Sequence, residues 1–467
     1  MTAADARAAP RTLFARLWDR HRIADLPGGA LLAIDRVLLH ERTGGVALAS
    51  LAAAGRRVAD PARAFATMDH IVDTLPGRGD ATTMPGGTAF IVETRAAARV
   101  AGITLFDIGA PEQGIVHVIS PELGIVLPGA TLVCPDSHTC TQGAFGALAW
   151  GIGSTEAEHA LATGTLRVKR PRTMRVTIDG CLPRGVTAKD VALTLLERHG
   201  AAGGSGCAIE FAGAGVHAMD IEARQTLCNM ATEFAAFTGM IAPDETVFAY
   251  LRGRRYAPAG MLWERAVTDW RTLRSDDEAA FDVEIALDAR DLAPMVSWGT
   301  TPSQSVAIDG AVPMPRTASD DRALAYVGLA PGTPLAGVKI DAAFIGSCTN
   351  SRLSDLRRAA ALLDGRRVAD GVRAIAVPGS TAVKRAAEAE GLHRIFLAAG
   401  FEWREAGCSM CFYAGGESFG AAQRVISSTN RNFENRQGPG TPTHIASPET
   451  VAASAVAGCI ADVRTFA

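Results

Sequence analysis

Short apolar runs rich in β-branched residues alternate with amphipathic stretches along most of this chain. Apolar runs bounded by glycine or polar residues are typical of buried strands, and apolar spacings of three and four are typical of helices. The predicted strands are 114–119, 130–134, 174–178, 283–287, 342–345 and 372–377, and the predicted helices are 188–199, 354–363 and 381–390. Because strands and helices alternate, we expect an α/β protein built in layers.

The length of the chain and two breaks in its composition predict the domain organisation. A chain of 467 residues corresponds to about three domains of ordinary size. A charged stretch with a proline at 169–173 precedes one predicted strand, and the polar stretch 274–278 precedes another. We therefore expect three α/β segments with the boundaries 1–171, 172–282 and 283–467.

Charge, hydropathy and cysteine usage argue against several classes of partner. The net charge is −3, and a nucleic-acid or RNA-binding protein would usually be strongly basic. The longest apolar run, 143–155, is too short and too rich in glycine to span a bilayer, and the first residues do not resemble a signal peptide. Nine cysteines, an odd number, predict the reducing cytoplasm, where clustered cysteines are more often metal ligands or catalytic groups than disulfides.

Three cysteines follow predicted strands in the last segment. Cys348 lies at the end of the strand 342–345, and Cys408 and Cys411 form a CxxC pair sixty residues later. Small buried core residues are one interpretation. A thioredoxin-like pair is disfavoured by the glycines that follow, and a four-ligand zinc site would need a second close pair. A third interpretation is a [4Fe–4S] cluster on three thiolates, which leaves one iron open to water or substrate.

Histidines and carboxylates stand together at the ends of other predicted strands. The pairs are Asp69 with His70 and Asp136 with His138, and His117 follows a further apolar run. Glu210 adds a carboxylate after a cluster of glycines. Such residues often only satisfy loop backbone, and Glu210 could be a solvated residue at a strand end. A carboxylate that fixes an imidazole also suits general acid–base catalysis.

Two arginines lie close together near the C-terminus. Arg431 and Arg436 are separated by a stretch with two asparagines. Guanidinium groups bind carboxylates with two parallel hydrogen bonds. The segment therefore suits a polyanionic small molecule, although an exposed loop with solvated arginines is the alternative.

Together, these motifs resemble the aconitase superfamily of iron–sulfur hydro-lyases, and most closely the large subunits of its 3-isopropylmalate dehydratase branch. The similarity is carried by GSCTNSR, CSMC and NRNFE at their present separations. The matching segments are 34–36, 65–70, 113–117, 136–139, 143–149, 227–230, 242–246, 298–300, 344–352, 408–411 and 430–434. The similarity therefore covers almost the whole chain.

The resemblance implies a cofactor and a set of site residues. It implies a [4Fe–4S] cluster on Cys348, Cys408 and Cys411. It implies the acid–base pairs Asp69 with His70, His117 with Asp136, and His138 with Glu210. It implies substrate binding by Ser137, Asn430, Arg431 and Arg436.

The resemblance also implies the fold, the reaction and a partner. The family has three α/β domains around the cluster and a fourth, swivel domain with a motif of the NFGCGSSRE type, which is absent from these 467 residues. In two-subunit members a separate small subunit carries that domain, so we expect this chain to need one. The expected reaction isomerises 2-isopropylmalate and 3-isopropylmalate, a dicarboxylate step of leucine biosynthesis.

Several positions depart from the usual large-subunit sequence. The departures are Ile71, Pro135, Gln142, Phe412 and Asn435. They border the cysteines and the arginines, so they could change the part of the site that accepts the substrate side chain. A paralogue acting on citramalate, citraconate or dimethylmalate therefore stays open.

Overall fold

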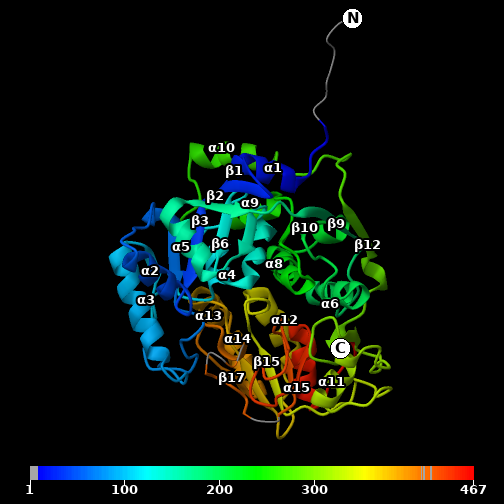
Figure 1. The fold of residues 1–467 in the computed structure, drawn as a ribbon. Coiled ribbons are helices and arrows are strands. Elements are labelled where there is room, and N and C mark those ends of the chain that lie inside the picture. The colour runs from blue at the N-terminus through cyan, green and yellow to red at the C-terminus, as the bar shows by residue number, and fades with distance from the viewer. Residues whose placement is uncertain (1–8, 412, 414–415, 421–422, 467) are drawn as a thin grey trace, which may run out of the picture.

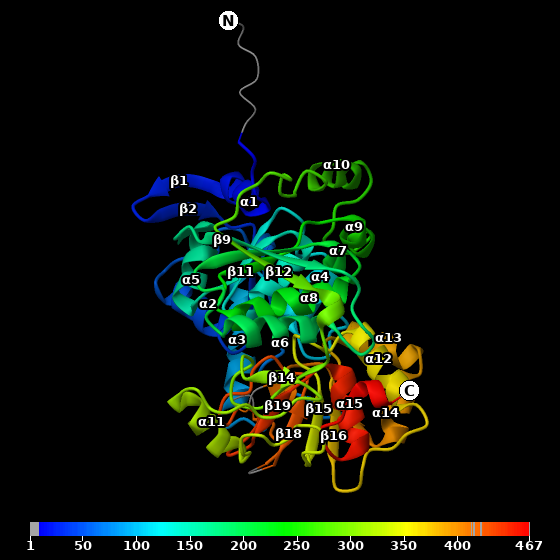
Figure 2. The ribbon, with the colours of Figure 1, turned by 90° about the vertical axis from the view of Figure 1, so that its right-hand side faces the viewer.

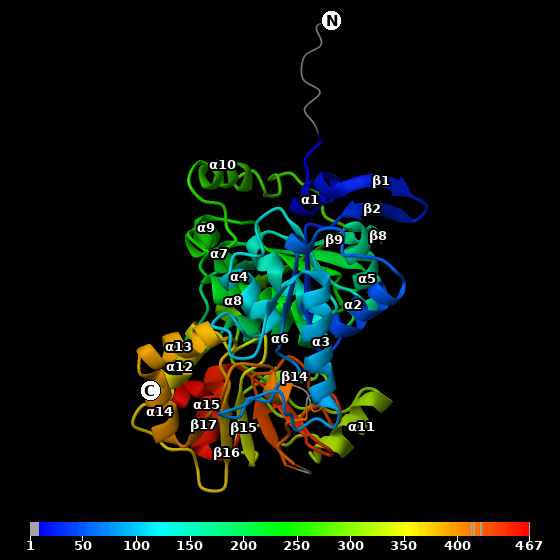
Figure 3. The ribbon, with the colours of Figure 1, turned by 90° about the vertical axis from the view of Figure 1, so that its left-hand side faces the viewer.

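Three parallel β-sheets, each flanked by helices, organise the chain in the computed structural model (Figure 1). The structure describes residues 9–466 except 412, 414–415 and 421–422. Figures 2 and 3 show the third sheet at one end of the molecule, and the β1–β2 hairpin (Arg22–Leu26, Gly29–Ala33) and α10 (Met261–Trp270) at the other. Within the described residues, no helix combines the length and hydropathy needed to cross a bilayer.

The first sheet has the strand order β5-β4-β3-β6-β7, and all of its neighbouring strands are parallel. Its strands are β3 (Arg36–His40), β4 (Ala64–Thr67), β5 (Thr104–Phe106), β6 (Thr131–Cys134) and β7 (Leu148–Gly151). Its helices are α2 (Gly44–Ala53), α3 (Gly87–Ala101), α4 (Val116–Glu122) and α5 (Ser154–Thr163). Helix α1 (Leu13–His21) and a small antiparallel sheet, in which β8 (Thr165–Val168) joins the hairpin, complete this part.

The second sheet has the parallel order β11-β10-β9-β12. Its strands are β9 (Arg172–Asp179), β10 (Cys207–Ala212), β11 (Thr238–Met240) and β12 (Val283–Asp288). Its helices are α6 (Ala188–His199), α7 (Ala214–His217), α8 (Ile221–Asn229), α9 (Glu245–Leu251) and α10. Strand β12 begins just past the expected boundary at 282, yet it pairs with β9 along its whole length. The second sheet therefore extends beyond that boundary.

The third sheet has the parallel order β17-β16-β15-β18-β19. Its strands are β15 (Ala342–Ile345), β16 (Arg373–Ala376), β17 (Phe401–Trp403), β18 (Val425–Ser427) and β19 (Thr443–Ile445). Its helices are α11 (Ala318–Val327), α12 (Leu353–Leu363), α13 (Thr381–Ala389), α14 (Leu392–Ala399) and α15 (Pro448–Ala457). An antiparallel hairpin of β13 (Met295–Ser297) and β14 (Ser305–Ala307) precedes it.

Two large hydrophobic cores and two smaller clusters hold these layers together in the described residues. One continuous core joins the first two sheets and includes Leu132 from the first and Leu227 from the second part. The third sheet packs around its own core, which includes Phe396. Helix α4 contributes to both, because Val116 belongs to the first core and Val118 to the other. The helix therefore connects the part of the chain built on the first two sheets to the part built on the third sheet.

Helix α4 occupies the segment 114–119 that was expected to be a strand, and that prediction is wrong. The first residues of the helix are buried in both cores, so the polar face that marks an exposed helix is missing. Its first backbone N–H, that of Val116, donates to the carboxylate of Asp69 at 2.8 Å. A group from a distant part of the chain thus satisfies a helix end that local sequence leaves open. The other predicted strands and helices are confirmed, with ends that differ by at most two residues.

Candidate active site

The carboxyl ends of the first and third sheets meet at one cavity of about 310 Å³. Ligands of α/β proteins usually bind at this end of the strands, because the loops there leave crevices. The lining residues are His40, Arg42, Thr43, His70, Ile115, His117, Pro135, Asp136, Ser137, His138, Cys348, Cys408, Cys411, Arg431 and Arg436. Most of the residues that the sequence singled out therefore come together here.

The Asp69–His70 pair follows strand β4. The carboxylate of Asp69 is fully buried, and its Oδ1 lies 2.6 Å from Nδ1 of His70. Glu41 fixes the turn, because it accepts hydrogen bonds from the backbone N–H groups of Asp69 at 3.0 Å and Ile71 at 2.5 Å. Burial opposes protonation of His70, but the charges of Asp69 and Cys408 outweigh it and raise the pKa of His70 well above its usual value. His70 is therefore built to hold a proton.

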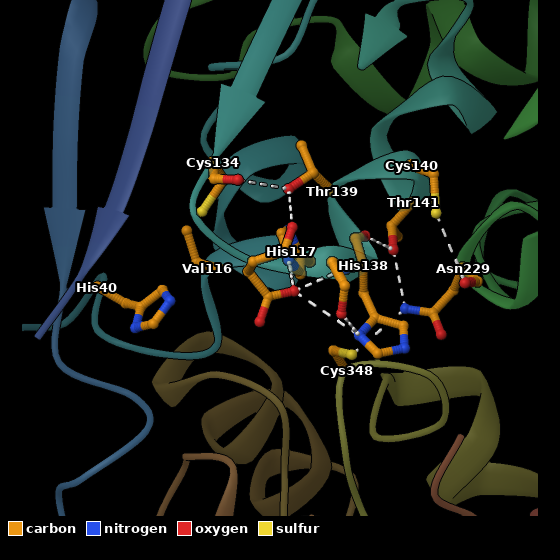
Figure 4. A network of polar contacts seen from close by, with 12 residues as sticks. His40, Val116, His117, Cys134, His138, Thr139, Cys140, Thr141, Asn229 and Cys348 are labelled. Carbon is orange, nitrogen blue, oxygen red and sulfur yellow. Dashed lines mark hydrogen bonds and ion pairs between the residues drawn. The ribbon is translucent and has the colours of Figure 1, made fainter. Parts of the chain in front are cut away.

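Asp136 is the common partner of three histidines. Its carboxylate lies 2.8 Å from Nε2 of His117 and 3.3 Å from Nε2 of His70. It also accepts the backbone N–H of His138 at 2.7 Å. Burial raises the pKa of Asp136, but hydrogen bonds from the histidines outweigh it and hold the pKa well below its usual range. Figure 4 shows His117 and His138 on the first-sheet side of the site, with Cys348 facing them from another element.

The carboxylate partner of His138 is Glu233, so the predicted pairing with Glu210 is wrong. Nε2 of His138 lies 2.9 Å from Oε1 of Glu233, in the 3₁₀ turn Met230–Phe234 after α8. Glu210 instead accepts a hydrogen bond from Ser275 at 2.6 Å. It lines a separate cavity with Arg175, because its position on β10 directs it away from the histidines. The matching segment 227–230 ends three residues before Glu233 and was the signal that could have identified it.

Cys348, Cys408 and Cys411 are buried, free thiols that line the same cavity. Cys348 follows β15 and receives hydrogen bonds from the side-chain amides of Asn229 and Asn430, each at 3.3 Å. Cys408 lies 3.8 Å from His70 Nδ1. Donors aimed at a sulfur stabilise the negative charge of a thiolate ligand. The sulfur environment therefore fits a bound metal centre.

The spacing of the three sulfurs does not match that of ligands on a single zinc ion. Two thiolates on one zinc lie within about 4.6 Å of each other, since each Zn–S bond is about 2.3 Å. Among the described residues, the metal-ligating groups that all lie within 4.8 Å of one another are those of His40, Glu41, Asp69 and His70. The cysteines do not form such a set. As they stand, the three sulfurs are therefore not close enough together to bind one zinc ion.

Strained backbone marks both cysteine loops. Ser347, directly before Cys348, has φ 77°, and Ser409, directly after Cys408, has φ 48°. Residues other than glycine rarely adopt this conformation, and it persists where surrounding contacts impose it, often at functional sites. The backbone at Ser347 and Ser409 is therefore held in a strained conformation next to the cysteines that line the cavity.

The predicted substrate residues divide into two groups. Arg431 lines the cavity, where its Nε lies 2.7 Å from Glu233 and its Nη1 donates to Ser137 at 3.0 Å. Arg436 also lines the cavity, with its guanidinium over the ring of Phe433. Asn430 does not line the cavity, because it is fully buried and donates to Cys348 and Thr349. It supports a cysteine rather than facing a ligand.

A family model for the aconitase family (aconitate hydratase) matches residues 15–458. The chain belongs to the aconitase family. A protein named "3-isopropylmalate dehydratase large subunit 1" from Bradyrhizobium diazoefficiens is 54% identical over 464 residues, which cover 98% of this chain and 97% of that relative. The three parallel sheets flanked by helices are the aconitase-type α/β fold that the sequence predicted.

The departures from the usual family sequence fall at different depths around the site. Pro135 lines the cavity, and its carbonyl lies 3.3 Å from Nε2 of His40. Gln142 is buried behind His117 and donates to its carbonyl at 3.3 Å. Ile71 is fully buried away from the cavity, and Phe412 lies outside the described residues. Among the departures that the structure describes, Pro135 is therefore one that a substrate would meet.

Arg42 and Thr43 were not predicted from the sequence, although both line the cavity. They follow β3, whose last residue is His40. Burial and the nearby charge of Arg436 lower the pKa of Arg42. The two arginines therefore repel each other, and an anion between them would relieve that repulsion.

Proposed function

We propose that this chain is the large subunit of an iron–sulfur hydro-lyase that isomerises 2-isopropylmalate and 3-isopropylmalate in leucine biosynthesis. The observation that carries the proposal is one cavity in which three buried cysteines face the histidines grouped around Asp136. The identity of 54% to a protein of that name supports the substrate. Pro135 at the cavity wall keeps a smaller 2-hydroxy dicarboxylate, such as citramalate or dimethylmalate, as the second candidate.

Cys348, Cys408 and Cys411 would hold a [4Fe–4S] cluster. When bound, such a cluster supplies an iron with an open position that polarises the substrate hydroxyl. The amides of Asn229 and Asn430 would stabilise the Cys348 ligand through the hydrogen bonds they already make to its sulfur. Reduced thiols are required for this role, which agrees with the cytoplasm expected from the cysteine pattern.

His70 would protonate the departing hydroxyl oxygen. Asp69 engages Nδ1 at 2.6 Å. Nε2, which lies 3.3 Å from Asp136 at the cavity wall, would turn its proton from Asp136 to the substrate oxygen. Arg431 and Arg436 would bind the substrate carboxylates, and their positive charges would offset negative charge that develops there. Glu233 keeps Arg431 oriented through their 2.7 Å contact.

The proton on the substrate carbon would be removed by a group from a small subunit. The relative that is 54% identical to this chain is itself named as a large subunit. The swivel-domain motif of the family is absent from these 467 residues. The cavity of this chain would therefore be completed by its partner.

Replacement of single cysteines tests the cofactor and the reaction together. In protein purified without oxygen and mixed with its small subunit, Ser in place of Cys348, Cys408 or Cys411 should abolish the brown colour and turnover of 2-isopropylmalate. The matched controls are Ser replacements of Cys181, Cys228 and Cys459, which do not line the cavity and should keep both. Iron content, absorbance and kcat/KM are measured. Full iron content in Cys408→Ser would contradict the ligand assignment, and a higher kcat/KM for citramalate or dimethylmalate would transfer the proposal to that substrate.

A further inference from the structure

Lys189 is a buried cation behind the cysteine loops that the proposed reaction does not use. It lies in the first turn of α6 and is 1% exposed. Its Nζ donates to Oδ1 of Asn350 at 3.1 Å and to the backbone carbonyls of Ser428 at 2.8 Å and Thr429 at 2.7 Å. Three acceptors require three N–H donors, and only the charged ammonium has three. This arrangement of three acceptors therefore favours the protonated form of Lys189.

The three acceptors belong to two loops that meet at one sulfur. Asn350 follows Cys348 by two residues. Ser428 and Thr429 directly precede Asn430, whose side-chain amide donates to Cys348 Sγ at 3.3 Å. Lys189 thus joins the loop that carries the cysteine to the loop that carries its hydrogen-bond donor. Both loops belong to the third sheet, whereas α6 belongs to the second part of the chain.

A buried ammonium among neutral acceptors needs negative charge nearby to offset its loss of hydration. Burial lowers the pKa of Lys189 to about 7, while the charge of Asp355 acts in the opposite direction. Three thiolate ligands would bring three negative charges to the other side of these loops. The positive charge of Lys189 and the negative charge of a bound cluster would therefore stabilise each other.

We propose that Lys189 is a positioning residue for the iron–sulfur cluster, which fixes the two loops around Cys348 and raises the reduction potential of the cluster through its charge. This inference rests on the proposed function. Reduction adds an electron to the cluster, and a nearby positive charge favours the more negative state. Removal of that charge should shift the potential to more negative values.

Two neutral replacements separate the charge of Lys189 from its hydrogen bonds. Lys189→Met removes both, whereas Lys189→Gln keeps N–H donors for the loop carbonyls. A cavity of about 380 Å³ also borders Lys189 and Asn350, so water can solvate a shorter side chain there. The matched control is Lys384→Met. It removes a lysine of α13 that forms an ion pair with Glu405.

The reduction potential is measured by dithionite titration of the anaerobic protein, with the electron paramagnetic resonance signal of the reduced cluster as the readout. Iron loss to a chelator is followed in parallel. Both Lys189 variants should show a more negative potential than the wild type and Lys384→Met. Iron loss should be severalfold faster in Lys189→Met than in Lys189→Gln. Should Lys189→Met not yield folded protein, Lys189→Gln alone tests the charge.

The outcomes separate this inference from the proposed function. Wild-type protein that holds no cluster would overturn the proposed function, and the role of Lys189 with it. Wild-type protein with a cluster, together with Lys189 variants of unchanged potential, would overturn only the inference. A potential that shifts equally in Lys384→Met would also overturn it, because the effect would then not depend on the position of the charge.

Discussion

Glu233 serves two site residues with one carboxylate oxygen. Its Oε1 lies 2.9 Å from Nε2 of His138 and 2.7 Å from Nε of Arg431. Burial raises the pKa of Glu233, but His138 and Arg431 outweigh burial and lower it. The ionised carboxylate therefore holds an imidazole and a guanidinium in fixed positions beside Asp136.

Glu233→Gln should lower kcat/KM about tenfold to a hundredfold, because a charge-assisted hydrogen bond contributes about 1.5–3 kcal/mol. Glu210→Gln is the matched control, since Glu210 contacts Ser275 outside the cavity. Its kcat/KM should stay near the wild-type value. Steady-state kinetics of the two-subunit enzyme measure both. Equal losses in the two variants would contradict the assignment of Glu233.

Arg436 follows a residue in the left-handed conformation. Asn435, where glycine is usual in the family, has φ 64°, a conformation that Asn adopts more readily than most residues. Its Oδ1 also accepts the backbone N–H of Gly440 at 2.7 Å. The Gly-to-Asn departure therefore leaves the turn intact and Arg436 at the cavity.

Arg436→Lys should reduce kcat/KM about ten- to a hundredfold, because lysine cannot replace a two-donor fork. A parallel fall in kcat would mean that Arg436 stabilises charge in the transition state, whereas a rise in KM alone would mean ground-state binding. Asn435→Gly is the control and should behave like the wild type. Unchanged kinetics in Arg436→Lys would leave Arg431 as the carboxylate-binding residue of this loop.

Acid–base pairs whose two members lie close together in the chain could be predicted from the sequence. Asp69 lies beside His70 in the chain, and Asp136 lies two residues from His138, so their proximity could be predicted. The partner of His138 was less accessible, because Glu210 follows only a cluster of glycines whereas Glu233 lies three residues beyond the matching segment 227–230. Which of the two carboxylates reaches His138 depends on how β10 and the turn after α8 orient their side chains in the folded chain.

At the scale of the elements, helix ends and strand contacts depend on distant groups. Helix α4 begins where Asp69 accepts the N–H of Val116, which no local pattern could reveal.

Strand β19 is similarly held by His444, whose Nδ1 lies 2.7 Å from the carbonyl of Ser297 on β13. Nη1 of Arg424 donates to its Nε2 at 2.9 Å. One ring nitrogen must donate and the other accept, so His444 is neutral.

His444 should make the fold sensitive to acid. Burial and the charge of Arg424 lower its pKa from 6.5 to about 4. Below pH 6.5 the unfolded chain therefore binds a proton that the folded chain does not, and stability falls as the pH falls toward 4. The loss is about 1.4 kcal/mol per pH unit, or about 2 kcal/mol between pH 7 and pH 5.

His444→Gln removes this titration and keeps a donor and an acceptor. Urea unfolding at pH 7 and pH 5 should show a smaller difference for the variant than for the wild type. The difference should shrink by about 2 kcal/mol. An unchanged difference would show that other groups cause the acid sensitivity.

At the scale of the whole molecule, the candidate active site lies between the part built on the first two sheets and the part built on the third sheet, and the proposed function would complete it with a small subunit. The first part supplies the histidines and carboxylates, and the third sheet supplies the cysteines and arginines. The α/β class could be predicted because strand and helix patterns alternate. The extension of the second sheet by β12 could not, since strand order depends on pairing between distant segments.

The purified chain without a small subunit should show no turnover of 2-isopropylmalate above background, even with a full complement of iron. The group that removes the carbon-bound proton is expected on the partner. Addition of the cognate small subunit should restore activity in proportion to complex formation. Partner-free protein that turns over as fast as the complex would contradict the two-subunit assignment.

The separate origins of the two cavity walls bear on how the protein survives oxidation. The histidine wall is fixed by Glu41 and by the Asp69 cap on α4, and none of these contacts involves a cysteine. Oxidative loss of iron from a bound cluster would therefore leave these hydrogen bonds of the acid–base residues in place. Repair of a bound cluster would then require iron, a reductant and, where sulfide is also lost, sulfide at the three thiols, without new synthesis of the chain.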